Sequence, residues 1–341
     1  MASAEKQTPA LLLVTREMRE AREDALSPLA TRSTASRGRA AEEEPDPFRT
    51  AFERDRDRIC HSKAFRRLKH KTQVFITPEG DHFVTRMSHT LQVTQIGRAI
   101  ARALNLNETL TEAICLGHDC GHTPFGHTGE AALTEYFDQG EWLHSEQGVR
   151  IFQVLEPKNL TWEVLDGIRA HTWRVKPPPH TAEGWVCRFA DRIAYLNHDY
   201  LDARRAGLLA GGDFPDEVAR VLGPHEGGAW IDRMIQAVLD ASVERGRVCM
   251  RPDVLNAIKV FRDYMFERVY LRPEARAQAE RARTVIHQLI EYLQHHPDRI
   301  PESYRSQEAP LELQVIDFVA GMTDRYALSL HDEFFRPRGL V

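Results

Sequence analysis

Residues 117–130 read GHDCGHTPFGHTGE, and this stretch decides how the rest of the chain is interpreted. The chain has 16 histidines, and three of them fall inside it. Histidine binds transition metals and titrates near neutral pH, so a cluster of histidines indicates a metal site or a site of proton transfer. The histidines in and around the stretch are His89, His118, His122, His127 and His144.

Helical spacing places two of these histidines on buried faces. His118 lies four residues after Ile114, and His89 lies four residues before Val93, so each shares an apolar helix face. Two inward histidines on successive helices can meet at a metal, and a buried Asp119 needs a cation or several hydrogen-bond donors. Such a donor set suits Mn, Fe, Co, Ni or Zn. The alternative is a pair of ordinary core histidines whose nitrogens are satisfied by hydrogen bonds.

The apolar periodicity predicts an all-α protein with a small β-hairpin. The expected helices cover about 93–104, a segment from near 107, about 186–196, and the region from about 231 to 335. Thr109 and Glu112 fit a capping box at the start of the second of these helices. The hairpin is expected over 72–86, with its turn at Pro78–Asp81.

Length and composition predict three regions in a cytoplasmic protein. A chain of 341 residues is long enough for about two domains. We expect an irregular N-terminal arm over 1–50, a core over 51–205 that carries the histidines, and a C-terminal helical region over 206–341. The five cysteines form no CxxC pair and are expected as reduced thiols. No window approaches the roughly 20 apolar residues of a membrane span, so we expect no membrane partner.

Residues 54–71 form a basic segment inside an acidic chain. Eight lysines and arginines stand against two aspartates there, a net charge of +6 in a chain whose net charge is -5. The total excludes a chain-wide basic surface for nucleic acid, whereas the segment predicts a local field for a polyanion such as a nucleoside triphosphate. The alternative, which is the commoner outcome for charge runs, is an amphipathic helix with a basic outer face.

A polar stripe follows on the predicted helix after the three prolines at 177–179. Asp191, Tyr195 and Asp199 recur every four residues and therefore lie on one face. The stripe is either a plain solvated face or, because a tyrosine stands between two acids, the wall of a pocket. Spacing alone does not select a metal ligand among these residues.

Together the motifs resemble the deoxynucleoside triphosphate triphosphohydrolases, a family of HD-domain phosphohydrolases. They are SKAFRRLKHKTQVF (62–75), TRMSHTLQV (85–93), GHDCGHTPFGHTGE (117–130), HSEQG (144–148) and RFADRIAYLNHD (188–199). The segments LSPLATRSTASRGR (26–39) and DRDRICHSKAFRRL (55–68) are similar to the bacterial dGTPase-like subgroup. The resemblance implies the helical HD-domain fold, with 51–205 as the phosphohydrolase core and 206–341 as a phosphohydrolase-associated region.

The resemblance also implies a role for each site residue. The implied metal ligands are His89, His118, Asp119 and Asp191. The implied catalytic residues are His127 near the α-phosphate, Glu130 as its orienting acid, and His122 beside the phosphates. The implied substrate contacts are phosphate oxygens for Arg86, Arg192 and His144, the deoxyribose ring for Tyr195, and the 3′-hydroxyl for Gln73 and Asp199.

The implied activity is metal-dependent hydrolysis of deoxynucleoside triphosphates at the α-phosphate, which contributes to control of the dNTP pool. The cofactor is a divalent ion, with Mg, Mn, Co, Fe and Ni all open. A histidine with a carboxylate partner can protonate a leaving oxygen near neutral pH, so we interpret His127 as the general acid, and a nucleophilic role stays open. The implied partners are the dNTP, further copies of the chain in a homo-oligomer that is often a hexamer, and a nucleotide or single-stranded DNA effector.

Two alternatives to this activity stay open. The first is another HD-domain phosphohydrolase, such as a nucleotidase or a phosphodiesterase, which would share the metal ligands and differ in its products. The second is a module that senses nucleotides or single-stranded nucleic acid and has no activity.

Overall fold

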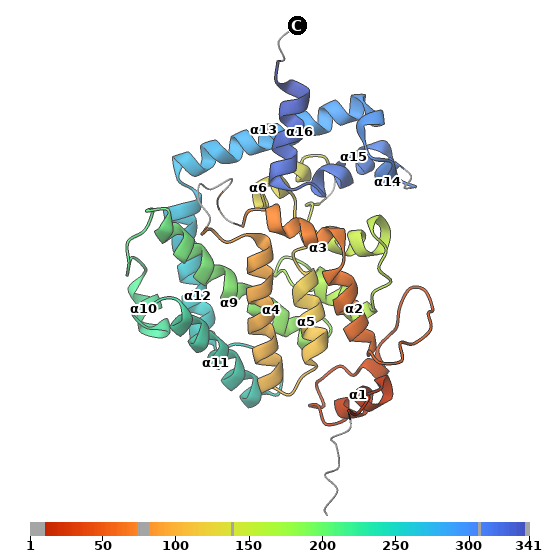
Figure 1. Cartoon of the computed structure of the whole chain (residues 1–341). Helices are drawn as coiled ribbons and strands as arrows, with labels where there is room; N and C mark the ends of the chain where they lie inside the picture. The colour runs from red at the N-terminus through yellow and green to blue at the C-terminus, as the bar shows by residue number, and fades with distance from the viewer. Residues whose placement is uncertain (1–10, 74, 76–81, 138–139, 306–307, 338–341) are drawn as a thin grey trace, which may run out of the picture.

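A computed structural model of the chain describes residues 11–73, 75, 82–137, 140–305 and 308–337. Within these residues the chain forms helices and no β-strand, so the expected all-α class is confirmed (Figure 1). Of the expected hairpin, one antiparallel bridge pairs Thr72 with Thr85. The turn expected at Pro78–Asp81 lies outside the described residues.

The helices follow one another along the chain, and the longest connection between them is residues 24–50. They are α1 (Arg16–Glu23), α2 (Ala51–Cys60), α3 (Lys63–Arg67), α4 (Arg86–Ala103), α5 (Glu108–Gly117), α6 (His127–Thr134), α7 (His144–Arg150), α8 (Trp162–Ala170), α9 (Ala182–Arg205), α10 (Asp216–Leu222), α11 (Gly228–Arg245), α12 (Pro252–Met265), α13 (Pro273–His295), α14 (Glu302–Arg305), α15 (Leu311–Ala320) and α16 (Asp324–Phe335). Two π-helical turns cover Ile151–Leu155 and Phe266–Tyr270. In the part of the chain that the structure describes, no helix is both long and apolar enough to cross a bilayer.

Helix α5 begins at a different cap from the expected one. The side chain of Asn107 accepts a hydrogen bond from the backbone N–H of Leu110, and the helix starts at Glu108. The predicted capping box of Thr109 and Glu112 is therefore wrong, because Thr109 already lies inside the first turn. Asparagine is the stronger N-cap of the two residues, which explains the earlier start.

Helices α4, α5 and α9 pack against one another at the centre of the molecule, and α2 and α8 cover α5 (Figure 1). The apolar stripe of α4 that the sequence predicts is buried, with Val93, Ile96 and Ile100 all inside the core. Helices α10–α12 join the same core, in which the ring of Trp230 packs edge-on against that of Phe261.

A second apolar cluster is formed by α13, α15 and α16 together with α6. Leu133 of α6 belongs to this cluster, as do Ile286 and Leu289 of α13, and the two helices are in contact. The C-terminal helices thus support α6, the helix that begins at His127. Helices α10–α12 pack with the preceding helices, so the boundary between the two cores does not fall near residue 205. The division of the chain into 51–205 and 206–341 stays a prediction.

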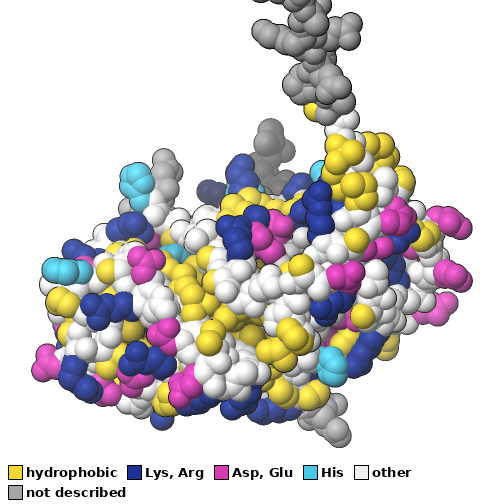
Figure 2. All heavy atoms as spheres, turned by 90° about the horizontal axis from the view of Figure 1, so that it is seen from below, with side chains coloured by type: hydrophobic (Ala, Val, Ile, Leu, Met, Phe, Trp, Pro, Cys, Tyr) yellow, Lys and Arg dark blue, Asp and Glu magenta, His cyan; other side chains and the backbone are white. Residues whose placement is uncertain are grey.

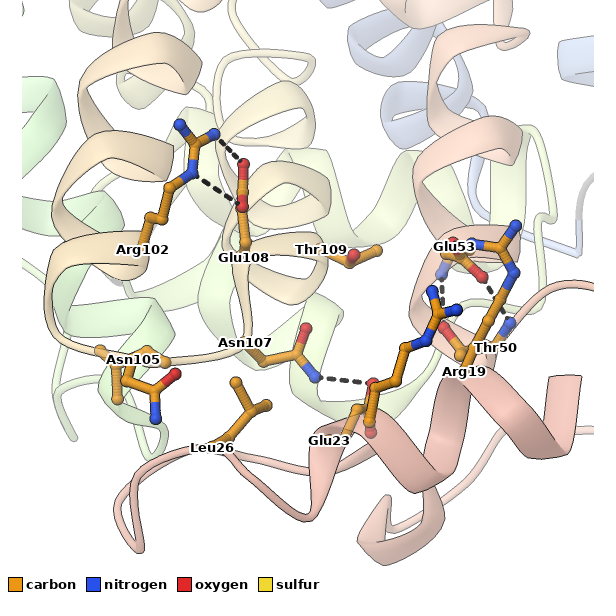
Figure 3. A pocket seen from close by; sticks show the side chains of 12 residues that line it. Arg19, Glu23, Leu26, Thr50, Glu53, Arg102, Asn105, Asn107, Glu108 and Thr109 are labelled. Atoms are coloured by element: carbon orange, nitrogen blue, oxygen red, sulfur yellow. Dashed lines mark hydrogen bonds and ion pairs between the residues drawn. The ribbon is translucent and has the colours of Figure 1, made fainter. Parts of the chain in front are cut away.

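The N-terminal arm contains a helix where the composition predicted irregular structure. Helix α1 forms because Thr15 caps it and Arg16 pairs with Glu20 one turn later, at 2.9 Å. The arm lies against the lower ends of α4 and α5, where Glu23 accepts a hydrogen bond from the Asn107 side chain at 3.1 Å (Figure 3). The expectation of an irregular arm was therefore wrong for residues 16–23.

The basic segment 54–71 does not present a row of free cations. Arg54 and Arg58 both pair with Glu43 of the arm, at 3.4 and 2.7 Å, and Lys71 is buried. Glu43 neutralises the two arginines and Lys71 is buried, so these three residues contribute neither to the predicted field nor to a basic outer helix face. Basic and acidic side chains are also interspersed over the face of the molecule seen in Figure 2.

Candidate active site

The start of α4, the end of α5 and the start of α7 bring the histidines together. Helix α4 starts at Arg86 and so carries His89 in its first turns, while α5 ends immediately before His118. The loop after α5 touches α7 so closely that a Cβ at Gly121 would lie 2.0 Å from the carbonyl oxygen of His144. Glycine at this position therefore permits the approach that joins the two segments.

The four residues expected to bind a metal converge in one cluster. His89 Nε2 lies 3.2 Å from Asp191 Oδ1 and 4.0 Å from Asp119 Oδ2. His118 Nε2 lies 3.4 Å from Asp119 Oδ1 and 3.9 Å from Asp191 Oδ1. The side chain of Asp191 is 24% exposed whereas the other three are buried, so Asp191 forms the accessible edge of the cluster.

The chemistry of these donors fits a metal ion. The Nδ1–H of His118 donates to the carbonyl oxygen of Cys115 at 2.6 Å, so the neutral ring carries its lone pair on Nε2. That nitrogen is buried without a hydrogen-bond partner and faces two carboxylates. A divalent cation would satisfy the lone pair and neutralise both acids, and the backbone carbonyl behind the ring is the usual outer partner of a metal-binding histidine. The chain therefore holds a His/Asp cluster that can bind a metal.

Both carboxylates of the cluster are ionised at neutral pH. Burial alone raises the pKa of Asp119, but the neighbouring histidines and Arg86 hold it well below the usual range. Burial also raises the pKa of Asp191, yet its hydrogen bond to His89 and the charges nearby lower it to about 2. Ionised carboxylates are the form that binds a metal ion.

A second cluster is built around Glu130. Its Oε2 accepts a hydrogen bond from His127 Nδ1 at 2.6 Å, and its Oε1 accepts from the backbone N–H and the Nδ1 of His144 at 2.8 and 2.7 Å. Burial would raise the pKa of Glu130, but His144 and His127 hold it well below its usual value. The side chain of His127 is 76% exposed, so its Nε2 is accessible while its Nδ1 is engaged.

His122 and Arg86 connect the two clusters. His122 stacks on His144 with ring centroids 3.7 Å apart, and its Nε2 lies 3.3 Å from Asp119 Oδ1. Burial lowers the pKa of His122 well below its usual value. Arg86 is 2% exposed and donates to Asp119 Oδ2 at 3.1 Å. Gly126 makes room for this arginine, because a Cβ there would lie 2.7 Å from Arg86 Nη2.

The polar stripe on α9 is not a plain solvated face, because Asp199 is buried and Asp191 and Tyr195 are only partly exposed. Asp199 is buried, which raises its pKa to about 7. One of its oxygens accepts a hydrogen bond from the hydroxyl of Tyr270, and the other has no partner. Tyr195 is half-buried on the same face. Arg192 extends over the ring of Trp173, with its guanidinium carbon 4.2 Å from the ring centroid.

Sequence reasoning missed two residues of the site. The Nε2 of His171, just after α8, lies 3.0 Å from Nε2 of His144, and its ring packs edge-on against His118. It follows the buried Ile168 by three residues, so it shares an apolar helix face as His118 does with Ile114 at a spacing of four. Tyr270 lies on a π-helical turn far along the chain, and no local pattern points to it.

Asp324, the first residue of α16, ties the C-terminal helices to the site. Its Oδ2 accepts from the backbone N–H and the hydroxyl of Thr72 at 2.9 and 2.6 Å, and its Oδ1 accepts from the N–H of Phe125 at 3.0 Å. Phe125 leads into His127, and Gln73 follows Thr72. The side-chain oxygen of Gln73 is buried and has no hydrogen-bond partner.

Comparisons with known proteins identify the family. Residues 86–196 match the HD domain, and residues 248–333 match the phosphohydrolase-associated domain. A deoxyguanosinetriphosphate triphosphohydrolase-like protein of Caldanaerobacter subterraneus is 49% identical over 318 residues, which cover 92% of this chain and 93% of the relative. This chain belongs to the deoxyguanosinetriphosphate triphosphohydrolase-like family. Another family member, from Desulfatibacillum aliphaticivorans, is 41% identical over 96% of this chain and 99% of its own length.

Membership of the deoxyguanosinetriphosphate triphosphohydrolase-like family confirms the resemblance that the motifs predicted. It makes the chain an HD-domain phosphohydrolase, and the cluster that can bind a metal lies inside the matched HD domain. A solved structure of a hypothetical protein from Aquifex aeolicus has a TM-score of 0.50 at 20% identity, over 83% of this chain and 68% of the other. That likeness concerns the fold alone.

Proposed function

We propose that the chain hydrolyses deoxynucleoside triphosphates at the α-phosphate and releases a deoxynucleoside and tripolyphosphate. The observation that carries the proposal is the hydrogen bond between the exposed His127 and the buried Glu130, beside a cluster of metal-binding side chains. The names of the family members, which specify deoxyguanosinetriphosphate triphosphohydrolase-like proteins, support the substrate class.

The proposed reaction needs a proton at the leaving oxygen. Water attacks the α-phosphorus and forms a new P–O bond, and the bond between phosphorus and the 5′-oxygen breaks. The 5′-oxygen leaves poorly as an alkoxide, so a general acid assists it. Because His127 gives its Nδ1–H to Glu130, the protonated ring holds its transferable proton on the exposed Nε2. In a neutral His127 the same nitrogen could instead attack the α-phosphorus and displace the 5′-oxygen. The triphosphate would then stay on the histidine until water hydrolyses it, and isolation of this triphosphohistidine would distinguish the route.

The triphosphate also needs its charge neutralised, because phosphoryl transfer depends mainly on positioning and electrostatic stabilisation. A divalent ion, when bound by His89, His118, Asp119 and Asp191, polarises phosphoryl oxygens and makes water a stronger nucleophile. We propose that Arg86 and Arg192 bind phosphate oxygens and that His122 lies beside the phosphates.

We assign recognition of the sugar to the wall formed by α9 and its neighbours. Asp199 keeps one buried oxygen without a partner, and the side-chain oxygen of Gln73 is likewise free. Both can bond the 3′-hydroxyl. The half-buried ring of Tyr195, one turn before Asp199, is then the surface on which a deoxyribose rests, where a 2′-hydroxyl would crowd it.

The test is product analysis with the purified chain. Each dNTP and each rNTP is incubated with Mg²⁺, Mn²⁺, Co²⁺, Fe²⁺ or Ni²⁺, and products are identified by chromatography and phosphorus NMR. Deoxynucleoside and tripolyphosphate should appear from dNTPs, with much less from rNTPs. Release of single phosphate or pyrophosphate would favour another HD-domain phosphohydrolase, and the absence of any hydrolysis would favour a sensing module.

Matched variants show whether activity comes from this site. His118→Ala should lose metal and activity together, because it removes a ligand whose Nε2 has no other partner. His180→Ala changes an exposed histidine outside both clusters and should retain both properties.

We further propose that the enzyme acts in the cytoplasm on the dNTP pool as a homo-oligomer that responds to a nucleotide or to single-stranded DNA. The five cysteines are free thiols, as is usual in a reducing compartment. Light scattering of the purified chain tests the assembly, and initial rates with added nucleotides or oligonucleotides test the effector.

A further inference from the structure

Arg192 on α9 is held by an aromatic ring and not by an acid. The side chain is half-buried, and its guanidinium carbon lies 4.2 Å from the centroid of the Trp173 ring. Within the part of the chain that the structure describes, this guanidinium forms no hydrogen bond and no ion pair. The contact with Trp173 is therefore what fixes the direction of the Arg192 side chain.

Contacts with α9 hold the Trp173 ring in place. The guanidinium carbon of Arg188 lies 4.6 Å from the ring centroid, and the ring of Phe189 packs edge-on at 5.5 Å. Arg188 is buried, and its Nη2 donates to the carbonyl oxygen of Thr172 at 2.6 Å. One buried arginine thus contacts both the indole ring and the backbone directly before it, so the ring has little freedom to turn.

The pair of Trp173 and Arg192 lies at the accessible edge of the candidate site. Trp173 follows the buried His171 by two residues, and Arg192 directly follows Asp191, whose side chain is 24% exposed. Burial lowers the pKa of Arg192, whereas Tyr195 and Asp191 raise it, so the guanidinium lies near both of these side chains. An unpaired positive charge is therefore held beside the most open of the residues that can bind a metal.

An indole face suits the task of holding this arginine better than a carboxylate would. It attracts the guanidinium through its π-electrons and leaves the N–H groups free, whereas a carboxylate would occupy those groups and neutralise the charge. Free N–H groups in a fixed plane match the oxygens of a phosphate, and an arginine that is already ordered loses less side-chain entropy when it binds. We propose that Trp173 is a positioning residue that directs Arg192 toward the triphosphate, and that Arg188 holds the Trp173 ring in the orientation this requires.

Because this positioning role rests on the proposed function, the test measures phosphate binding separately from hydrolysis. The probe is inorganic tripolyphosphate, whose Kd for the full chain is measured by calorimetry with Mg²⁺ in excess. Trp173→Leu should raise this Kd by about 2- to 30-fold, which corresponds to about 0.5–2 kcal/mol for one cation–π contact. Trp173→Phe keeps most of the packing and a weaker aromatic face, so it should raise the Kd measurably but less. In an Arg192→Met background neither change should raise the Kd further, because the cation that the ring holds is absent.

The matched control is Trp162→Leu. Trp162 is another half-buried tryptophan with an arginine over its ring, because the guanidinium carbon of Arg37 lies 3.8 Å from the ring centroid. This contact joins the N-terminal arm to the start of α8 and involves neither cluster of the candidate site. Trp162→Leu should therefore keep the wild-type Kd for tripolyphosphate.

Several results would overturn the positioning role. An unchanged Kd in Trp173→Leu or in Arg192→Met would do so, and so would an equal loss for the Trp173 variants with and without Arg192. A wild-type chain that binds no tripolyphosphate would overturn it as well. Assays of dNTP hydrolysis on the same preparations separate this inference from the proposed function. Tripolyphosphate binding that depends on Trp173, without hydrolysis of any dNTP, refutes only the proposed function, and hydrolysis with the same Kd in wild type and Trp173→Leu refutes only the positioning role.

Discussion

Gly126 offers the most direct test of how the loop before α6 is built. Its backbone has φ +57° and ψ −131°, a conformation that residues with a side chain rarely adopt. A Cβ at this position would lie 2.7 Å from Nη2 of Arg86, which is 2% exposed and bonded to Asp119. Gly126→Ala therefore strains the backbone and also displaces a buried guanidinium.

The two effects are of similar size. The strained backbone costs roughly 1–3 kcal/mol, and loss or lengthening of a buried charged hydrogen bond costs about 1.5–3 kcal/mol. After the smaller entropy of the unfolded alanine chain is taken into account, we expect the free energy of unfolding to fall by about 2–5 kcal/mol. Because Arg86 is also assigned to a phosphate oxygen, hydrolysis should fall at least about tenfold.

The matched control is Gly212→Ala. Gly212 has φ +77°, and a Cβ there meets nothing within 4 Å, so this variant carries only the backbone cost of about 1–3 kcal/mol. Urea unfolding of the metal-free chain measures both variants. A double-mutant cycle with Arg86→Ala isolates the contact, because the extra cost of alanine at 126 should disappear when the guanidinium is absent. An extra cost that persists in the Arg86→Ala background would refute the proposed clash.

Three further predictions follow from the same contacts. His127→Ala should keep its metal content and lower hydrolysis by about 10²–10⁴-fold, because it removes the proposed acid; a fully active variant in the product assay would rule out that role. Asp199 has a folded-state pKa of about 7, above its unfolded value. Between about pH 4 and pH 7 the folded state therefore holds a proton on this carboxyl that the unfolded state has lost. The free energy of unfolding falls as pH rises through that window. Asp199→Asn should therefore gain stability relative to wild type between pH 5 and pH 8, by about 3 kcal/mol in urea unfolding, and an equal difference at both pH values would contradict the assignment. Asp324→Asn cannot accept all three bonds from Thr72 and Phe125, so it should lose about 2–4 kcal/mol of unfolding free energy, and an unchanged urea midpoint would show that these bonds contribute little.

Part of the site could be predicted because it depends on local spacing. His127 and Glu130 are three residues apart on one helix, and α6 brings them into hydrogen-bond contact at 2.6 Å. His89 and His118 were predicted from the buried faces of their own helices, and both are buried as expected. Asp191 could not be chosen by spacing, because Asp199 lies on the same stripe. The family resemblance selected it.

Other parts could not be predicted, because they depend on residues that packing brings together. His171 had a usable signal, since its helical spacing from the buried Ile168 places it on an apolar face as for His118, and it was missed. No sequence signal points to Tyr270 or Asp324. Each forms a hydrogen bond with a residue far away in the sequence, and a periodic pattern does not predict such a bond. The roles assigned to the site residues stay predictions until the variants are measured.

The sequence by itself determined the helical class, the positions of the buried helix faces and the family, because these follow from residue spacing and short motifs within single segments. Only the tertiary structure decided which charges meet. Arg54 and Arg58 pair with Glu43, where the sequence predicted a field for a polyanion, and Nε2 of His144 lies 3.0 Å from Nε2 of His171. The physical reason is that charge pairing and proton placement act over a few ångströms in space, and helix packing sets those distances between residues that are far apart along the chain.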